Sequence, residues 1–279
     1  MKRFLKILLL FILLGGVLYE YRDSIPFLRP APCTEPIPYA LGTFDNRFGI
    51  SKDYFLSALR DAEAIWEKPS GIDLFSYSPA VPAPKSLQIN LIYDYRQEAT
   101  SKLKSLGIAV ENTRASYDAL RQKYLALKGE YEKEKREFEA RVATGKRTGY
   151  SKTEATELER MQDDINAKVD QINALVVVLN RLAGTLNISV DKYNTVNVSR
   201  GESFEEGVYV QDGLNREIDI YEFENRDKLV RVLAHELGHA LGLPHVADPK
   251  AIMYEFNKGN TEVLSAADLE ALNAKCRVE

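Results

Sequence analysis

The sequence predicts an α+β protein that is interrupted by a long helical hairpin. Short strand and helix patterns occupy residues 36–94 and return from about residue 200. Between these two regions, apolar residues follow the 3-4 spacing of a heptad seam, which indicates two helices packed against each other. With 45% hydrophobic residues, a chain of 279 residues can bury a sizeable core.

Residues 1–32 resemble an export segment followed by a linker. The basic start "MKRFLK" precedes an uncharged apolar run over residues 7–19, but no small-residue cleavage site follows this run. We therefore expect an uncleaved signal anchor that tethers the protein to a membrane. The basic residues would stay in the cytoplasm and the rest of the chain would lie outside. If the segment were cleaved, the protein would be secreted.

The two cysteines of the chain lie close to the ends of its folded part. Cys33 follows the linker and Cys276 is four residues from the end. In an exported protein this even, low count suggests one disulfide between the two ends, and two unrelated buried thiols are the alternative.

The first globular part is expected over residues 33–97. The stretch "PIPYALGTFD" alternates apolar and other residues as a half-buried strand does. Ser51 is a good N-cap for an amphipathic helix that Gly71 would end. Two further strands are expected at residues 72–77 and 87–94, so this part reads strand, helix, strand, strand.

Residues 98–199 are expected to form an antiparallel coiled-coil hairpin. A heptad seam runs through residues 103–138, restarts at residue 158 and continues to residue 186, with the Gly-containing stretch "TGKRTGYS" as the turn. Such a seam indicates packing rather than a ligand site. Residues 175–179, "LVVVL", are apolar all round, so we expect this end of the hairpin to be buried against more than its partner helix.

The second globular part is expected over residues 200–279. The stretch "EGVYVQDG" has the character of an edge strand, and "REIDIYEF" alternates like a more central strand. Asn225 can cap a helix that presents several leucines to the core and carries the first two histidines of the chain.

All three histidines of the chain lie within "HELGHALGLPH", residues 235–245. His235 and His239 are four residues apart on the predicted helix, so their side chains lie on one face and can bind one ion together. Gly242 can adopt a positive φ, which ends the helix and returns His245 as a third ligand. Three imidazoles with an open fourth position describe a catalytic zinc site rather than a structural one. Glu236 lies close enough to hold a metal-bound water without being a ligand.

Other chemistries find no support in the sequence. The net charge of -4, from 37 basic and 41 acidic residues, does not indicate a nucleic-acid partner. The chain has no Gly-rich phosphate loop and no G-x-S-x-G nucleophile motif. A second zinc held by histidines is excluded because all three are already used, whereas a Ca²⁺ site made of carboxylates and carbonyls remains open.

The stretch "HELGHALGLPH", followed by "VADPKAIMYEF", resembles the metzincin metalloproteases and, among them, the matrixins. The resemblance implies a twisted mixed sheet with an antiparallel edge strand, an active-site helix, and a small lower subdomain that ends in the helix "SAADLEALNAK". It implies that Met253 forms the hydrophobic floor under the zinc and that Tyr254 lines the pocket for the residue after the scissile bond. The helical hairpin has no counterpart in the family pattern.

These observations predict a zinc-dependent metalloendopeptidase that hydrolyses extended segments of peptides or proteins outside the cytoplasm. Glu236 would be the general base on the zinc-bound water, and the substrate would lie along the edge strand. The alternative is a membrane-tethered coiled-coil protein that binds an envelope partner through its helical arm, with a zinc domain that is mainly structural. Glu236 favours the enzyme, because a purely structural zinc site needs no base.

Overall fold

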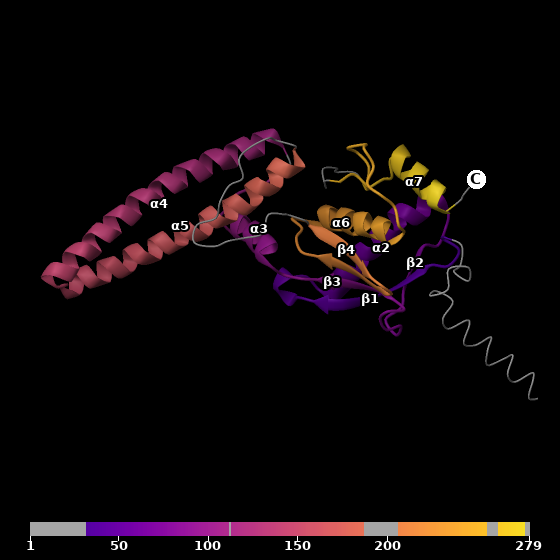
Figure 1. The fold of residues 1–279 in the computed structure, drawn as a ribbon, viewed down its shortest axis with the longest axis horizontal. Coiled ribbons are helices and arrows are strands. Elements are labelled where there is room, and N and C mark those ends of the chain that lie inside the picture. The colour runs from indigo at the N-terminus through magenta and orange to yellow at the C-terminus, as the bar shows by residue number, and fades with distance from the viewer. Residues whose placement is uncertain (1–31, 112, 187–205, 256–261, 277–279) are drawn as a thin grey trace, which may run out of the picture.

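The structure, a computed structural model, describes residues 32–111, 113–186, 206–255 and 262–276. They form a body of one sheet and several helices, from which two long helices project (Figure 1). The predicted export segment, residues 1–31, lies outside the described residues. Within the described ranges, no helix has the length and apolar character that crossing a membrane requires.

The body is built on a five-stranded mixed sheet with the strand order β2-β1-β3-β5-β4. The strands are β1 (Ile37–Phe44), β2 (Phe75–Tyr77), β3 (Leu87–Leu91), β4 (Gly207–Asp212) and β5 (Asn215–Ile220). β1 pairs in parallel with β2 and β3, and β3 pairs in parallel with β5, whereas β4 is antiparallel to β5. The predicted edge strand is therefore at the edge, and β5 is internal.

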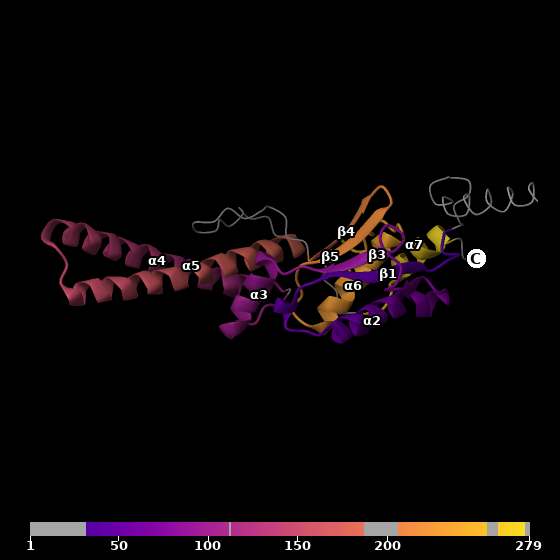
Figure 2. The same cartoon turned by 90° about the horizontal axis from the view of Figure 1, so that it is seen from below.

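Two helices, α2 (Lys52–Ser70) and α6 (Arg226–Ala240), cover one face of this sheet (Figure 2). Both begin at the predicted caps: the Ser51 and Asn225 side chains accept hydrogen bonds from backbone N–H groups of their first turns. The two helices share one core with the sheet. Within it the Trp66 indole is fully buried and donates a hydrogen bond to a carbonyl of α6.

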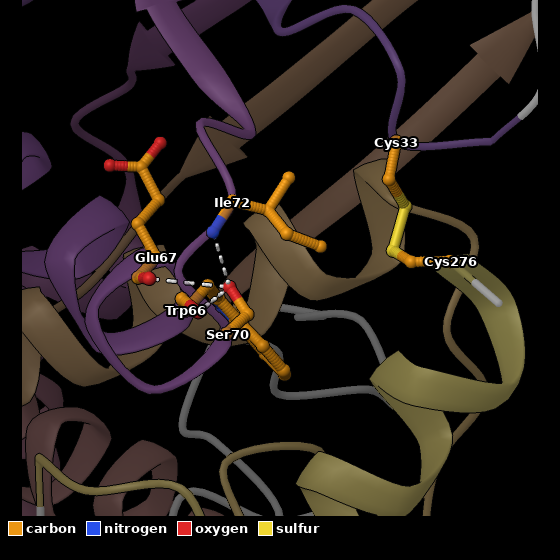
Figure 3. Close-up of a disulfide and its surroundings, with 6 residues drawn as sticks. All are labelled: Cys33, Trp66, Glu67, Ser70, Ile72 and Cys276. Atoms are coloured by element: carbon orange, nitrogen blue, oxygen red, sulfur yellow. Dashed lines mark hydrogen bonds between the residues drawn. A yellow bond between two sulfur atoms is a disulfide. The ribbon is translucent and has the colours of Figure 1, made fainter. Parts of the chain in front are cut away.

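A short C-terminal helix, α7 (Ala266–Cys276), packs beside α2 and is tied to the start of the body. Cys33, which precedes β1, forms a disulfide with Cys276, and the two Cα atoms are 5.3 Å apart (Figure 3). The pairing expected from sequence is thus present. In the same region the Ser70 hydroxyl closes α2 by accepting a hydrogen bond from the Ile72 N–H at 3.3 Å. The helix α7, which Cys276 ends, lies at the end of the body away from the projecting helices (Figure 1).

The two projecting helices, α4 (Arg114–Thr148) and α5 (Lys152–Thr185), run side by side in opposite directions and are called the arm below (Figures 1 and 2). The prediction of one continuous helix over residues 103–138 is wrong. A separate helix, α3 (Tyr95–Ser105), ends near Gly107, whose φ of 67° is left-handed, and α4 begins only after Thr113 caps it.

The base of the arm is buried more deeply than the rest of the arm. Residues 175–179 are all buried, and at this level α5 packs against α3 as well as α4. This confirms the expectation that the all-round apolar stretch meets more than one partner. Because α3 contributes Ala99 and Leu103 to the arm's core, the boundary expected between residues 97 and 98 falls inside a helix that belongs structurally to the arm.

Candidate active site

The three histidines converge on one point. The Nε2 atoms of His235 and His239 are 3.1 Å apart, those of His239 and His245 are 3.1 Å apart, and those of His245 and His235 are 3.3 Å apart. Three nitrogens placed about 2.0–2.1 Å from one zinc ion at corners of a tetrahedron are roughly 3.3 Å from one another. The spacing of the donors therefore fits zinc. Among the described residues, these side chains form the group suited to hold a metal ion.

The hydrogen bonds of the imidazoles support the same assignment. The Nδ1 atom of His235 lies 2.7 Å from the Ile252 carbonyl, and the Nδ1 atom of His239 lies 3.0 Å from the Leu243 carbonyl. A carbonyl only accepts, so each Nδ1 carries the proton and each Nε2 presents a lone pair. Two lone pairs that face each other at 3.1 Å repel, and a cation between them removes that repulsion.

Burial favours the metal-binding form of these rings. It lowers the pKa of His235 from 6.5 to about 4, and the hydrogen bond to the Ile252 carbonyl opposes that shift. Burial also lowers the pKa of His239. Both imidazoles are therefore neutral at pH 7, which is the form that coordinates metals.

Glu236 is buried beside the histidines, with 4% of its surface exposed. It lies on α6 directly after His235, and the start of the edge strand packs against its carbon stem. A Cβ atom placed on Gly207 would lie 3.2 Å from the Glu236 Cγ and 2.9 Å from the Val232 side chain. Only a residue without a side chain fits so closely between β4 and α6.

A sharp turn after α6 brings His245 back to the site. Gly242 has a φ of 82°, and its N–H donates to the His239 carbonyl at 2.8 Å. The next residue, Leu243, donates its N–H to the Gly238 carbonyl at 3.0 Å. Left-handed backbone at Gly242 thus ends the helix as the sequence predicts.

Met253 is fully buried beneath this region, in the turn expected from the family pattern. A Cβ atom on Gly238 would lie 2.2 Å from the Met253 sulfur and 2.9 Å from the Trp66 ring, so the glycine leaves room for both side chains. The N–H of Val246, directly after the third histidine, donates to the Met253 carbonyl at 2.9 Å. Tyr254 follows and forms a bridge with Val246. Its place beside the third histidine is compatible with a pocket residue, and that role stays a prediction.

Sequence reasoning missed two buried charged residues that hold this turn. The Asp268 carboxylate, on α7, accepts hydrogen bonds from the N–H groups of Ile252 at 2.8 Å and Met253 at 2.9 Å. From the other side, the buried Arg231 of α6 donates to the Ala251 carbonyl. The Ile252 carbonyl in turn orients His235. These residues therefore fix the candidate metal ligand His235 indirectly, through backbone groups.

The comparisons with known proteins agree with this geometry. The family model for the matrixins matches residues 140–274. The match begins within α4 and runs through α5, β4, β5 and α6 into α7, so it includes the histidine motif and the methionine turn. No curated protein and no solved structure matches the chain. Matrixins are zinc metallopeptidases, and the family implies a catalytic zinc, which the three histidines fit. The family match and the convergent histidines together support a matrixin-like metzincin.

Proposed function

We propose that the protein is a zinc-dependent metalloendopeptidase that hydrolyses extended segments of peptides and proteins outside the cytoplasm. The observation that carries this proposal is the convergence of the three Nε2 atoms within 3.3 Å next to the buried Glu236. His235, His239 and His245 would hold the metal. A structural zinc site is normally closed by four protein ligands, and among the described residues no fourth ligand accompanies the three histidines.

Glu236 would supply the acid-base chemistry. A zinc ion held by the three histidines supplies a Lewis acid that makes water acidic near neutral pH and polarises a peptide carbonyl. The Glu236 carboxylate would accept a proton from the attacking water and later deliver it to the leaving amine. Its burial keeps it away from bulk water, and Gly207 holds its stem against the edge strand.

Strand β4 would bind the substrate. It pairs with β5 along one side only, in the part of the chain that the structure describes, so its other edge can accept a further strand. An extended peptide would lie there antiparallel to β4 through backbone hydrogen bonds, with Tyr254 lining the pocket for the residue after the scissile bond. An open edge selects no chain end, which favours an endopeptidase over an exopeptidase.

Substituting the base tests the proposal. Glu236→Ala should retain one zinc per chain and lose at least ~100-fold in the rate of peptide cleavage, the usual contribution of a general base. Asp227→Asn, an exposed acidic residue on the same helix, is the control and should keep the parental rate. His239→Ala should lose the metal. A parental cleavage rate in Glu236→Ala would refute the assigned role.

The alternative, a coiled-coil binding protein with a structural zinc domain, makes the opposite prediction. It requires a zinc-loaded, folded protein that leaves a diverse peptide pool uncut. The same experiment decides the cofactors. Chelation should abolish cleavage, and zinc alone should restore it. A further increase on adding calcium would indicate a Ca²⁺ site made of carboxylates and carbonyls.

We also propose that the body functions outside the cytoplasm and is anchored to a membrane by its N-terminal segment. The Cys33–Cys276 disulfide supports the compartment, because such bonds persist in oxidising environments. The basic and apolar start of the sequence supports the anchor. In a bacterial host, the protein should stay with membranes after carbonate washing, and external protease should reach its body. A soluble, N-terminally trimmed product would show secretion instead.

The arm is proposed to bind an envelope partner or to control access of folded substrates. Trimming it above its buried base separates this role from folding. The ion pair between Glu134 and Lys168, at 2.9 Å, marks one level of the hairpin. Replacing residues 135–167 with a short Gly-Ser turn should keep hydrolysis of short peptides and change the rate on folded proteins severalfold. Unchanged selectivity and unchanged capture of envelope proteins would reject both roles.

A further inference from the structure

The base of the arm is joined to the body by a buried ion pair. The Arg181 guanidinium, on α5, is 6% exposed, and its Nη1 atom lies 3.0 Å from an oxygen of the fully buried Glu222, which follows β5. The other Glu222 oxygen accepts a hydrogen bond from the Thr100 hydroxyl of α3 at 2.8 Å. Burying two charged side chains costs solvation free energy, a cost that two apolar side chains in the same place would not have. The pair is therefore better explained as fixing one arrangement of the arm on the body than as adding stability.

The same arginine reaches the residue that precedes the edge strand. Its Nη1 atom lies 3.5 Å from a carboxylate oxygen of Glu206, whose side chain is 12% exposed. The Glu206 carbonyl accepts the N–H groups of Tyr221 at 2.9 Å and Glu222 at 3.1 Å. Glu206 is therefore held through its side chain by the arm and through its backbone by the end of β5.

Glu206 also acts on the active-site helix. Burial lowers the pKa of Lys228, on α6, and the negative charge of the Glu206 carboxylate opposes that shift. The Glu206 carboxylate therefore interacts electrostatically with a side chain of α6. The next residue, Gly207, begins β4 and pairs with Ile220. An added Cβ on Gly207 would lie only 3.2 Å from the Glu236 Cγ, so a displacement of this residue changes the packing around the Glu236 stem.

We propose that Arg181 of the arm is a positioning residue for the catalytic centre, which acts through Glu206 to hold Gly207 against Glu236. The chain of contacts runs from α5 to the first residue of the edge strand and then to the carbon stem of the base. The base of the arm then helps to position the catalytic residues, in addition to supporting the distal part of the hairpin. The effect on catalysis rests on the proposed peptidase function, whereas the effect on position does not.

Glu206→Gln tests the proposal most directly, because it removes the charge at the 3.5 Å contact and leaves the Arg181–Glu222 pair in place. We expect kcat to fall at least about tenfold, since a misplacement of ~1 Å can cost up to 100-fold. Zinc content should change less than about twofold, because the three histidines remain. The fall in kcat should exceed any rise in KM, because Gly207 lies against the Glu236 stem whereas β4 stays paired with β5. Glu134→Gln removes an arm ion pair far from the site and should match the parent.

A double-mutant cycle tests the route. If Arg181 acts through Glu206, Arg181→Lys should lower kcat alone but add little to Glu206→Gln, whereas independent effects would multiply. A parental kcat in folded, zinc-loaded Glu206→Gln would overturn the proposal, and so would an equal loss in Glu134→Gln. Failure of both Glu206→Gln and Arg181→Lys to fold would make the contact structural and would overturn it as well.

Hydrogen exchange separates this proposal from the peptidase function. If the zinc-loaded parent cleaves no peptide, the proposed function fails, but the positioning can still be measured. In zinc-free protein, Glu206→Gln should speed amide exchange at residues 207–210 and 232–236 relative to Glu134→Gln. Equal exchange in the two variants would overturn the positioning role regardless of activity.

Discussion

Asp268→Asn should loosen the turn beneath the histidines. The carboxylate is fully buried and accepts N–H groups from Ile252 at 2.8 Å, Met253 at 2.9 Å and Ser265 at 2.8 Å. An amide keeps only one accepting oxygen, so at least one N–H loses its acceptor. We expect about 2 kcal/mol for that loss and roughly 1 kcal/mol for each remaining bond that becomes neutral, about 4 kcal/mol in all.

Two assays on the same samples read this change. Urea unfolding of the zinc-free protein gives the free energy of unfolding, and chelator competition gives zinc affinity. The affinity should fall ~10–100-fold, as when a group that orients a metal ligand is disturbed, because the Ile252 carbonyl fixes His235. Glu270→Gln, exposed on the same helix, should stay within about 0.5 kcal/mol of the parent. A stability within about 1 kcal/mol of the parent together with parental zinc affinity for Asp268→Asn would refute the reasoning.

Three further predictions concern packing, pH and the disulfide. Gly238→Ala places a Cβ 2.2 Å from the buried Met253 sulfur and should destabilise the protein by about 1–3 kcal/mol. Gly129→Ala places a Cβ that meets nothing within 4 Å and should stabilise the protein by ~0.5–1 kcal/mol. Urea midpoints in the reverse order would contradict this prediction. Burial lowers the pKa of His235 from 6.5 to about 4, so the unfolded chain takes up this proton at a higher pH than the folded chain does. The zinc-free protein should therefore lose stability as the pH falls from 6.5 to about 4. A free energy of unfolding that does not change over this pH range would contradict the prediction. Replacing Cys33 and Cys276 with serine opens a loop of 243 residues and should cost about 5.5 kcal/mol in the chain-entropy model. A loss under about 1 kcal/mol in a urea titration would reject that estimate.

The parts of the structure that sequence could predict are those encoded by neighbouring residues. The caps Ser51 and Asn225 and the stop at Gly71 are local signals, and each lies where it was expected. The candidate metal site is also local, because a helix repeat and one left-handed glycine bring His235 and His245 together.

What sequence could not predict depends on distant partners. Asp268 and Arg231 act on backbone groups 15–20 residues away, and backbone acceptors leave no sequence signal. The pair of Arg181 and Glu222 spans 41 residues, so neither charge indicates the other. The break after α3 was missed for a different reason, because the apolar spacing continues across Gly107 while its backbone cannot remain helical.

The bond between Cys33 and Cys276 closes almost the whole body into a covalent ring. Any single backbone cut between these residues, whether by another protease or by a second copy of this chain, opens the ring without releasing a fragment. A nicked molecule therefore gains the mass of one water and migrates as one band without reductant, and it separates into two pieces only when the sulfur bond is reduced. Self-digestion of this protein would stay hidden on a non-reducing gel and would show in an intact-mass measurement only as the added water. Stocks should therefore be checked under reducing conditions before any rate is assigned to whole chains.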